Sequence, residues 1–224
     1  MGVTDGRSTR PRIGLLGGTF DPIHVGHLAL ARAARVALQL DEIRLIPTGQ
    51  PWQKGPGITP ATHRLAMTQL AARAEHWLRV DKREVLRSGL TYTVDTLAEL
   101  RTQEGSAAAL ILLLGSDQLR NLASWHHHER LLELAHIAVT QRGLSSLTDL
   151  PSAVEALVQR HGRDALPDEP CGSLVFFRMP AVPISATVLR QQLAAGERPI
   201  ELLPEGVLDY IDRHGLYRVQ APSD

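Results

Sequence analysis

An unbroken apolar run near the middle of the chain constrains the fold more than any other feature. Residues Ala108–Leu114 carry no polar side chain and have the length of a single strand. The run is well short of the ~18–20 apolar residues that cross a bilayer. Apolar residues on both faces of a strand are typical of a parallel sheet that helices cover on either side. The run therefore predicts the buried centre of an α/β domain.

Shorter apolar runs alternate with helical patterns along the rest of the chain. We expect strands at Ile13–Leu16, Glu42–Ile46, Leu78–Val80 (continuing past Asp81), Ala108–Leu114, Ile137–Thr140 and Leu174–Phe177. We expect helices at Val25–Leu38, Pro60–His76, Val94–Gln103, Leu131–Leu134, Ser152–Gln159, Ala186–Ala195 and Val207–His214. The alternation predicts an α/β fold, with an open, mostly parallel, doubly wound (Rossmann-like) sheet. Helices should cover both of its faces, with a small C-terminal helical portion.

We interpret the 224 residues as one domain with short extensions. Residues 1–11 are polar and lack the apolar core of a signal peptide, so we expect a flexible N-terminal leader. Residues 12–218 form the single expected domain, and residues 219–224 a flexible tail. Within the domain, residues 144–170 are the least strand-like stretch, and we expect a variable surface segment there with one helix.

The charge balance argues against a nucleic-acid partner. The chain has 24 basic and 24 acidic residues and no formal net charge, whereas nucleic-acid binders carry a basic surface. The only cysteine, Cys171, excludes an intrachain disulfide and fits a reducing compartment. We therefore expect a cytoplasmic protein with neither a nucleic-acid nor a membrane partner.

The segment Gly17–His27 follows the first expected strand and opens a helix, with the sequence GGTFDPIHVGH. Its two glycines allow the backbone to come close to a bulky ligand, and the N–H groups of a helix start favour an anion. His24 and His27 share one face of that helix start, and both rings can donate hydrogen bonds to phosphate. A tight turn with incidental histidines is the alternative, and the combination of residues disfavours it. The segment is neither a P-loop nor a GxGxxG motif.

A second anion site is predicted at Ile184–Arg190, with the sequence ISATVLR. Ser185 is placed to cap a helix, and Ser185, Thr187 and the first helical N–H groups can bind an anion together. Arg190 can reach the same site, because a guanidinium binds phosphate through two N–H groups. An ordinary capped helix with a surface arginine is the alternative.

Together the two segments resemble the nucleotidylyltransferase superfamily. Gly17–His27 is similar to its HxGH signature, and Ile184–Arg190 is similar to its ISSTxIR signature except at Ala186. The resemblance implies that the two histidines contact the ATP phosphates and stabilise the transition state. The ATP-binding residues that it implies are Gly17, Gly18, Thr19, Phe20, His24, His27, Ile184, Ser185, Thr187 and Arg190.

Segments between residues 12 and 218 further resemble the bacterial nicotinate-nucleotide adenylyltransferase family. Ile46–Lys54 lies where that family has a proline-rich acceptor loop ending in a basic residue, Leu90–Leu97 resembles its SYTxDTL run, and Leu114–Asp117 its G-x-D. The acceptor-binding residues that the resemblance implies are Thr48, Tyr92, Thr93, Gly115, Asp117, Trp125 and His126.

Within this set the resemblance assigns separate roles. Tyr92 and Thr93 approach the pyridine nucleotide, Asp117 faces the ribose, and Trp125 stacks on the pyridine ring, which suits an aromatic face. Structural alternatives are a helix cap for Tyr92 and Thr93, core packing for Trp125 and a solvated loop position for Lys54, and Thr93 could both cap the helix and contact the nucleotide. We also interpret the triplet His126–His128 as no metal site, because consecutive helical side chains point in different directions.

The resemblance implies transfer of the adenylyl group of ATP to nicotinate mononucleotide, giving nicotinate adenine dinucleotide and pyrophosphate for NAD biosynthesis. His24, His27, Lys54 and Arg190 are the expected catalytic residues, acting by positioning and by charge neutralisation. Mg²⁺ is expected to bind mainly through the ATP phosphates, with no metal site made by the protein. Alternatives are another acceptor, such as nicotinamide mononucleotide or phosphopantetheine, or a non-catalytic nucleotide sensor. A homo-oligomer also remains open.

Overall fold

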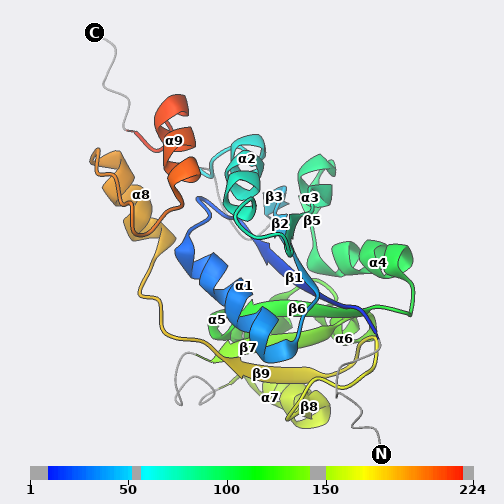
Figure 1. Ribbon diagram of the computed structural model, residues 1–224. Coiled ribbons are helices and arrows are strands. Elements are labelled where there is room, and N and C mark those ends of the chain that lie inside the picture. Colours follow the sequence, from blue (N-terminus) through cyan, green and yellow to red (C-terminus); the bar gives the residue numbers. More distant parts are fainter. Residues whose placement is uncertain (1–9, 52–56, 142–149, 219–224) are drawn as a thin grey trace, which may run out of the picture.

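The computed structural model describes residues 10–51, 57–141 and 150–218. Its centre is a seven-stranded parallel sheet with the strand order β4-β2-β1-β6-β7-β9-β8 (Figure 1). The strands are β1 (Arg12–Gly18), β2 (Glu42–Pro47), β4 (Leu78–Val80), β6 (Ala109–Gly115), β7 (His136–Gln141), β8 (Gly162–Arg163) and β9 (Leu174–Arg178). The predicted Rossmann-like α/β fold is confirmed, and every strand pair in this sheet is parallel.

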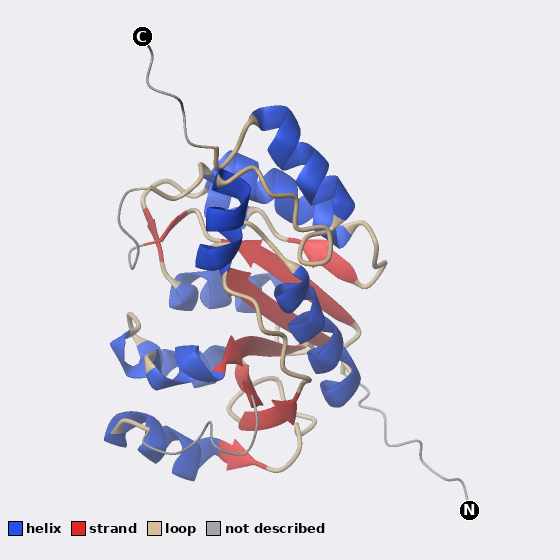
Figure 2. Ribbon diagram, turned by 90° about the vertical axis from the view of Figure 1, so that its left-hand side faces the viewer, coloured by secondary structure: helices blue, strands red, loops and turns tan. Residues whose placement is uncertain are grey.

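Helices lie on both faces of the sheet (Figure 2). The helices are α1 (Val25–Leu38), α2 (Ala61–Ala72), α3 (Arg83–Leu86), α4 (Thr93–Glu104), α5 (Ser116–Arg120), α6 (Leu131–Leu134), α7 (Ser152–His161), α8 (Ala186–Ala194) and α9 (Glu205–His214). The last two form the predicted C-terminal helical portion, and α9 packs against α2 (Figure 1). Among the described residues, no helix is long and apolar enough to cross a membrane.

Strand β6 explains why the molecule has two apolar clusters. Ala109, Ile111 and Leu113 belong to the cluster on one face of the sheet. Leu110, Leu112 and Leu114 alternate with them and belong to the cluster on the other face. Full burial of one leucine side chain contributes about 1.5–3 kcal/mol, so this strand stabilises both layers at once, as its unbroken apolar run predicted.

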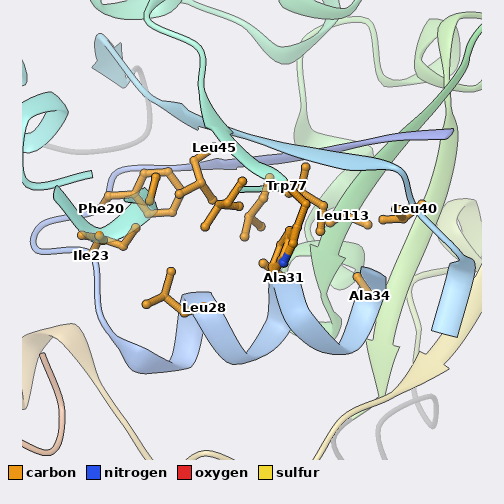
Figure 3. Packing of buried hydrophobic residues seen from close by; sticks show 14 of the residues in the cluster. Phe20, Ile23, Leu28, Ala31, Ala34, Leu40, Leu45, Trp77 and Leu113 are labelled. Atoms are coloured by element: carbon orange, nitrogen blue, oxygen red, sulfur yellow. The ribbon is translucent and has the colours of Figure 1, made fainter. Parts of the chain in front are cut away.

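Helix α1 covers the sheet through a row of small and branched side chains. Leu28, Ala31 and Ala34 are buried at helical spacing, and they lie on the side of α1 that faces the sheet, with Ala31 next to Trp77 (Figure 3). The two alanines are fully buried, which lets the helix lie close to the strands. This contact fixes the start of α1, and with it the segment that joins β1 to α1.

Some expected boundaries are wrong for local reasons. Helix α2 ends at Ala72, before the expected His76, and Pro60 is its N-cap residue rather than part of its first turn. Strand β4 ends at Val80 instead of continuing past Asp81, because the Asp81 carboxylate accepts hydrogen bonds from the backbone and side chain of Arg83. That turn begins α3, which was not expected.

Three further short elements carry too few residues for a periodic signal. Strands β3 (Gln50–Pro51) and β5 (Leu90–Thr91) form a separate two-stranded parallel sheet, and β8 pairs with β9 at the edge of the main sheet. The helix expected near 152–159 is α7, but it is not purely superficial, because Val154 is fully buried in the second apolar cluster.

Candidate active site

A cavity of about 320 Å³ opens at the carboxyl ends of β1, β2 and β6. Ligands of open parallel sheets bind at this edge, so the cavity lies where the fold predicts a site. Its lining residues are Leu15, Gly17, Gly18, Thr19, Phe20, Asp21, His27, Ile46, Thr48, Glu84, Thr91, Thr93, Thr96, Leu97, Leu112, Leu114, Gln118, Trp125, Ala186 and Arg190.

The loop between β1 and α1 forms one wall of the cavity. Phe20 has a positive φ of 48° and is buried, with only 2% of its surface exposed. Its ring lies so close to Gly18 that a Cβ atom there would be 2.8 Å from the ring. The backbone of Thr48 donates a 2.9 Å hydrogen bond to the carbonyl of Gly18. The loop is thus shaped by its own phenylalanine and tied to the end of β2.

The two histidines of the loop are stacked, with ring centroids 3.7 Å apart. His24 is the N-cap residue of α1, and its backbone N–H donates to Nδ1 of His27 at 3.2 Å. Because Nδ1 accepts this bond, a neutral His27 ring carries its proton on Nε2 and can donate from there. His27 lines the cavity, whereas the buried His24 lies behind it and is outside the lining.

The two sequence motifs meet at Gly26. A Cβ atom on Gly26 would lie 2.6 Å from Cγ2 of Ile184, so only glycine allows this contact without a shift. Ser185 is the N-cap residue of α8, as expected, but its side chain makes no capping hydrogen bond. Ala186 and Arg190 line the cavity, and Thr187 does not.

Asp21, which was not predicted as a site residue, connects several elements around the cavity. Its carboxylate accepts a 2.7 Å hydrogen bond from the Tyr217 hydroxyl and a 3.3 Å bond from the backbone of Thr59. Arg190 donates to its backbone carbonyl at 2.9 Å. Burial, and then the charge of Asp21, raises the pKa of Tyr217 well above its ordinary value, so this residue keeps its hydroxyl proton.

A buried arginine holds the backbone of the same wall in place through hydrogen bonds. Arg64, on α2, is 1% exposed. Its guanidinium donates to three backbone carbonyls, those of Thr59 at 2.8 Å, Thr19 at 2.7 Å and Gly49 at 2.9 Å. Burial lowers the pKa of Arg64, but an arginine stays protonated in proteins. One cation therefore joins three loops. The sequence carries no local signal for this role, because the three partners are backbone atoms of distant segments.

The opposite wall comes from several short elements. Thr93 and Trp125 line it. Trp125 also packs against the second apolar cluster, so the same side chain contributes to the core and to the cavity wall. Tyr92 is the N-cap residue of α4 and Thr93 is its first residue, so the alternative of a helix cap holds for Tyr92 and not for Thr93. The Tyr92 ring lies 4.4 Å from that of the exposed His126.

Glu84 is a buried acid in this wall that the sequence did not reveal. It lies on α3, is 8% exposed and accepts a 2.7 Å hydrogen bond from the Thr96 hydroxyl. Burial raises the pKa of Glu84, because the charged carboxylate loses its water. Gln118 also lines the cavity, and its side-chain oxygen accepts the backbone N–H of Gly115 at 2.9 Å.

The structure brings about half of the predicted site residues to the cavity. The predicted residues that line it are Gly17, Gly18, Thr19, Phe20, His27, Thr48, Thr93, Trp125 and Arg190. The predicted residues outside the lining are His24, Ile184, Ser185, Thr187, Tyr92, Gly115, Asp117 and His126. Lys54 lies outside the described residues. Over the described parts of the chain, no cluster of three or more His, Cys, Asp or Glu side chains could hold a metal ion.

Fold and site together define a nucleotide-binding α/β protein of one known class. The sequence profile of the cytidylyltransferase-like family matches residues 15–192, a span that contains both motifs, and the chain belongs to this family.

Within that class, similar sequences share one name. The chain is 45% identical over 215 residues to the probable nicotinate-nucleotide adenylyltransferase of Laribacter hongkongensis, covering 96% of this chain and 98% of the relative. It is 42% identical over 213 residues to the protein of the same name from Cellvibrio japonicus, covering 93% and 100%. The resemblance to the bacterial nicotinate-nucleotide adenylyltransferase family is confirmed.

Solved structures agree on the fold. The nicotinic acid mononucleotide adenylyltransferase of Plasmodium falciparum, complexed with NaAD, has a TM-score of 0.70 and 20% sequence identity, covering 92% of this chain and 97% of that chain. A putative nicotinate-nucleotide adenylyltransferase from Vibrio parahaemolyticus has a TM-score of 0.59 and 14% identity, covering 94% and 97%.

Proposed function

We propose that the chain transfers the adenylyl group of ATP to nicotinate mononucleotide, releasing nicotinate adenine dinucleotide and pyrophosphate for NAD biosynthesis. The observation that carries the proposal is that His27, Arg190 and Trp125 line one cavity. The cavity thus offers phosphate-binding groups on one side and a flat aromatic face on the other. The identity of 45% to a relative named for this reaction supports the same conclusion.

The proposed chemistry needs no proton transfer from the acceptor. The acceptor phosphate, already an anion, attacks the α-phosphorus in line, a new P–O bond forms, and the bond to the β-phosphate oxygen breaks. Negative charge then builds on the departing pyrophosphate. Catalysis consists of holding the two reactants in this geometry and of stabilising that charge.

We assign the stabilisation of the leaving pyrophosphate to His27 and Arg190. The Nε2–H of His27 donates to phosphate oxygens, and the guanidinium of Arg190 supplies a positive charge. His24 stacks on the His27 ring at 3.7 Å and holds its orientation, and its own phosphate contact remains a prediction. Lys54 is likewise proposed to meet phosphate. Gly17–Phe20 and Ile184–Thr187 are proposed to surround the rest of the ATP.

Mg²⁺ fits this site as an ion carried by the substrate. Both carboxylate oxygens of Asp21 accept hydrogen bonds, and Glu84 accepts one from Thr96. The acids of the cavity are therefore engaged with the protein, and we propose that the ATP phosphates supply most of the oxygen ligands. When bound, the ion neutralises phosphate charge. The protein residues position the phosphates around it.

The acceptor is proposed to bind against the opposite wall. Trp125 provides the face for the pyridine ring, and Thr93 and Tyr92 lie at the start of α4 beside it. His126 extends this aromatic surface through its contact with Tyr92. Thr48, Gly115 and Asp117 are proposed to contact the remainder of the nucleotide, with Asp117 facing the ribose.

A side-by-side assay of pyrophosphate release tests the proposal. The protein is incubated with ATP, Mg²⁺ and either nicotinate mononucleotide or nicotinamide mononucleotide, and the dinucleotide product is identified by mass. We expect faster turnover with the acid. Equal rates, or a preference for the amide, would keep the adenylyl transfer but overturn the proposed acceptor. No pyrophosphate release with either acceptor would overturn the enzymatic function.

A further inference from the structure

The segment after α9 returns to the active site. Gly215 and Tyr217 have positive φ angles of 59° and 65°, which turn the chain back toward the β1–α1 loop. A positive φ costs a tyrosine conformational energy, so a compensating contact is expected there. That contact is the 2.7 Å hydrogen bond from the Tyr217 hydroxyl to Oδ1 of Asp21, which joins residues 196 positions apart.

Asp21, which accepts this hydrogen bond, holds a charged carboxylate at a buried position in the cavity wall. Asp21 is 7% exposed, and it lines the cavity beside the residues assigned to the ATP phosphates. An unscreened carboxylate there would repel phosphate, because like charges interact strongly where water is excluded. Its two oxygens instead accept hydrogen bonds from Tyr217 and from the backbone of Thr59, which hold the carboxylate in place and offset its charge.

The same residue also holds Arg190. The guanidinium of Arg190 donates to the backbone carbonyl of Asp21 at 2.9 Å while it lines the cavity. Asp21 therefore contributes both a negative charge in the cavity wall and a backbone acceptor for the arginine that is proposed to bind phosphate. Tyr217 is outside the cavity lining, so it acts on the nucleotide through the residues that it contacts, of which Asp21 lines the cavity.

We propose that Tyr217 is a positioning residue for ATP binding. Its hydroxyl fixes the carboxylate of Asp21, the residue whose backbone carbonyl holds Arg190, on the phosphate side of the cavity. The proposal rests on the proposed function for the identity of the nucleotide. It predicts a selective effect: loss of the hydroxyl weakens ATP binding and leaves the acceptor side unchanged.

Two matched substitutions test this role, Tyr217→Phe and Tyr210→Phe. Tyr210 lies on α9, and its hydroxyl also makes one hydrogen bond, to Nδ1 of His63 at 3.0 Å, but it does not line the cavity. Each variant thus loses one hydroxyl from the same part of the chain. The parent and both variants are compared by calorimetric titration with MgATP alone, and by the KM for each substrate.

We expect Tyr217→Phe to raise the Kd and KM for ATP by about tenfold, the scale of a lost hydrogen bond to a charged group. The KM for the acceptor should stay within about twofold of the parent, and Tyr210→Phe should leave all values unchanged. Because KM does not depend on the folded fraction, partial unfolding of a variant cannot imitate this split.

Unchanged ATP binding in Tyr217→Phe, or an equal rise in both KM values, would overturn the role. An equal effect of Tyr210→Phe would overturn it as well. The proposed function is judged separately, from turnover by the parent protein.

Discussion

The two sides of the cavity are built in different ways. The side proposed to bind phosphate is built mainly from one continuous segment, Gly17–His27, which Arg190 joins from α8. Contacts to Arg64, Tyr217 and Ile184 set the shape of this segment. The acceptor side is assembled from the ends of α3, β5, α4 and α5 and from the turn that holds Trp125. Of the residues that line this side, Gln118 is exposed, and so are Asp117 and His126, which lie outside the lining but are proposed to contact the acceptor.

This difference indicates a division of tasks. Phosphate groups are the same in every reaction of ATP, so a fixed cradle with donors already in place suits that side. The acceptor side must recognise one particular heterocycle, and short elements can be varied there without disturbing the sheet. Substitutions on the phosphate side should therefore affect turnover or the whole fold, and those on the acceptor side should affect one substrate.

The largest expected effect is on turnover. His27→Ala removes a donor that acts on the leaving pyrophosphate, and we expect kcat to fall by about 10²–10³. The exposed His76 provides the control, because His76→Ala should leave kcat unchanged. Steady-state kinetics measure both variants. Near-parental turnover of His27→Ala would show that this ring does not act in the mechanism. It would also contradict the expectation that substitutions on the phosphate side affect turnover.

The next effect is on stability. Arg64→Met leaves three backbone carbonyls, partly or fully buried, without the donor that they share, and we expect a loss of about 3 kcal/mol in the free energy of unfolding. Urea denaturation measures this loss. The control is Arg32→Met, which removes an exposed ion pair with Glu75 and should cost less than about 1 kcal/mol. Equal losses in the two variants would show that the phosphate wall does not depend on its buried cation.

A smaller and more selective effect is expected on the acceptor side. Trp125→Ala should raise the KM for nicotinate mononucleotide roughly tenfold, the scale of one lost stacking contact. The KM for ATP should not change. Trp125→Phe, which keeps a flat ring, should recover most of the affinity. If the KM for ATP rose in parallel, the two sides would not be separable.

The smallest expected effect is pH-dependent. Because burial raises the pKa of Glu84, the folded chain binds this proton more tightly than the unfolded chain. The resulting stability is complete below the unfolded pKa of about 4.3 and is lost as the pH rises through the higher folded value.

The side chain in Glu84→Gln cannot ionise, so this variant does not lose stability as the pH rises. Its amide oxygen can still accept the hydrogen bond from the Thr96 hydroxyl. Its Tm relative to the parent should therefore increase as the pH rises from the unfolded pKa of about 4.3 through the higher folded pKa of Glu84. The exposed Glu133→Gln serves as the control. A pH-independent Tm difference would show that Glu84 carries no buried charge in this wall.

The same contrast explains what the sequence could predict. The main strands and the bounds of α1 follow from apolar runs and periodicity, and the phosphate loop is a contiguous motif. The two-residue strands β3 and β5 have no period to detect. The roles of Arg64, Tyr217 and Glu84 depend on partners from distant segments, so no local pattern announces them. The contact between Gly26 and Ile184 likewise joins residues that are far apart in the sequence and meet only in the folded chain.

The bond between Asp21 and Tyr217 has a consequence for the order in which the protein matures. The β1–α1 loop emerges early from the ribosome, whereas its partner, 196 residues further on, emerges only after the whole sheet has been synthesised. Contacts of such large sequence separation form late, because the intervening chain must first be closed into a loop. The nascent polypeptide can thus form its sheet before the β1–α1 loop has its full set of contacts, and we expect its affinity for ATP to reach the final value only when Tyr217 has reached Asp21.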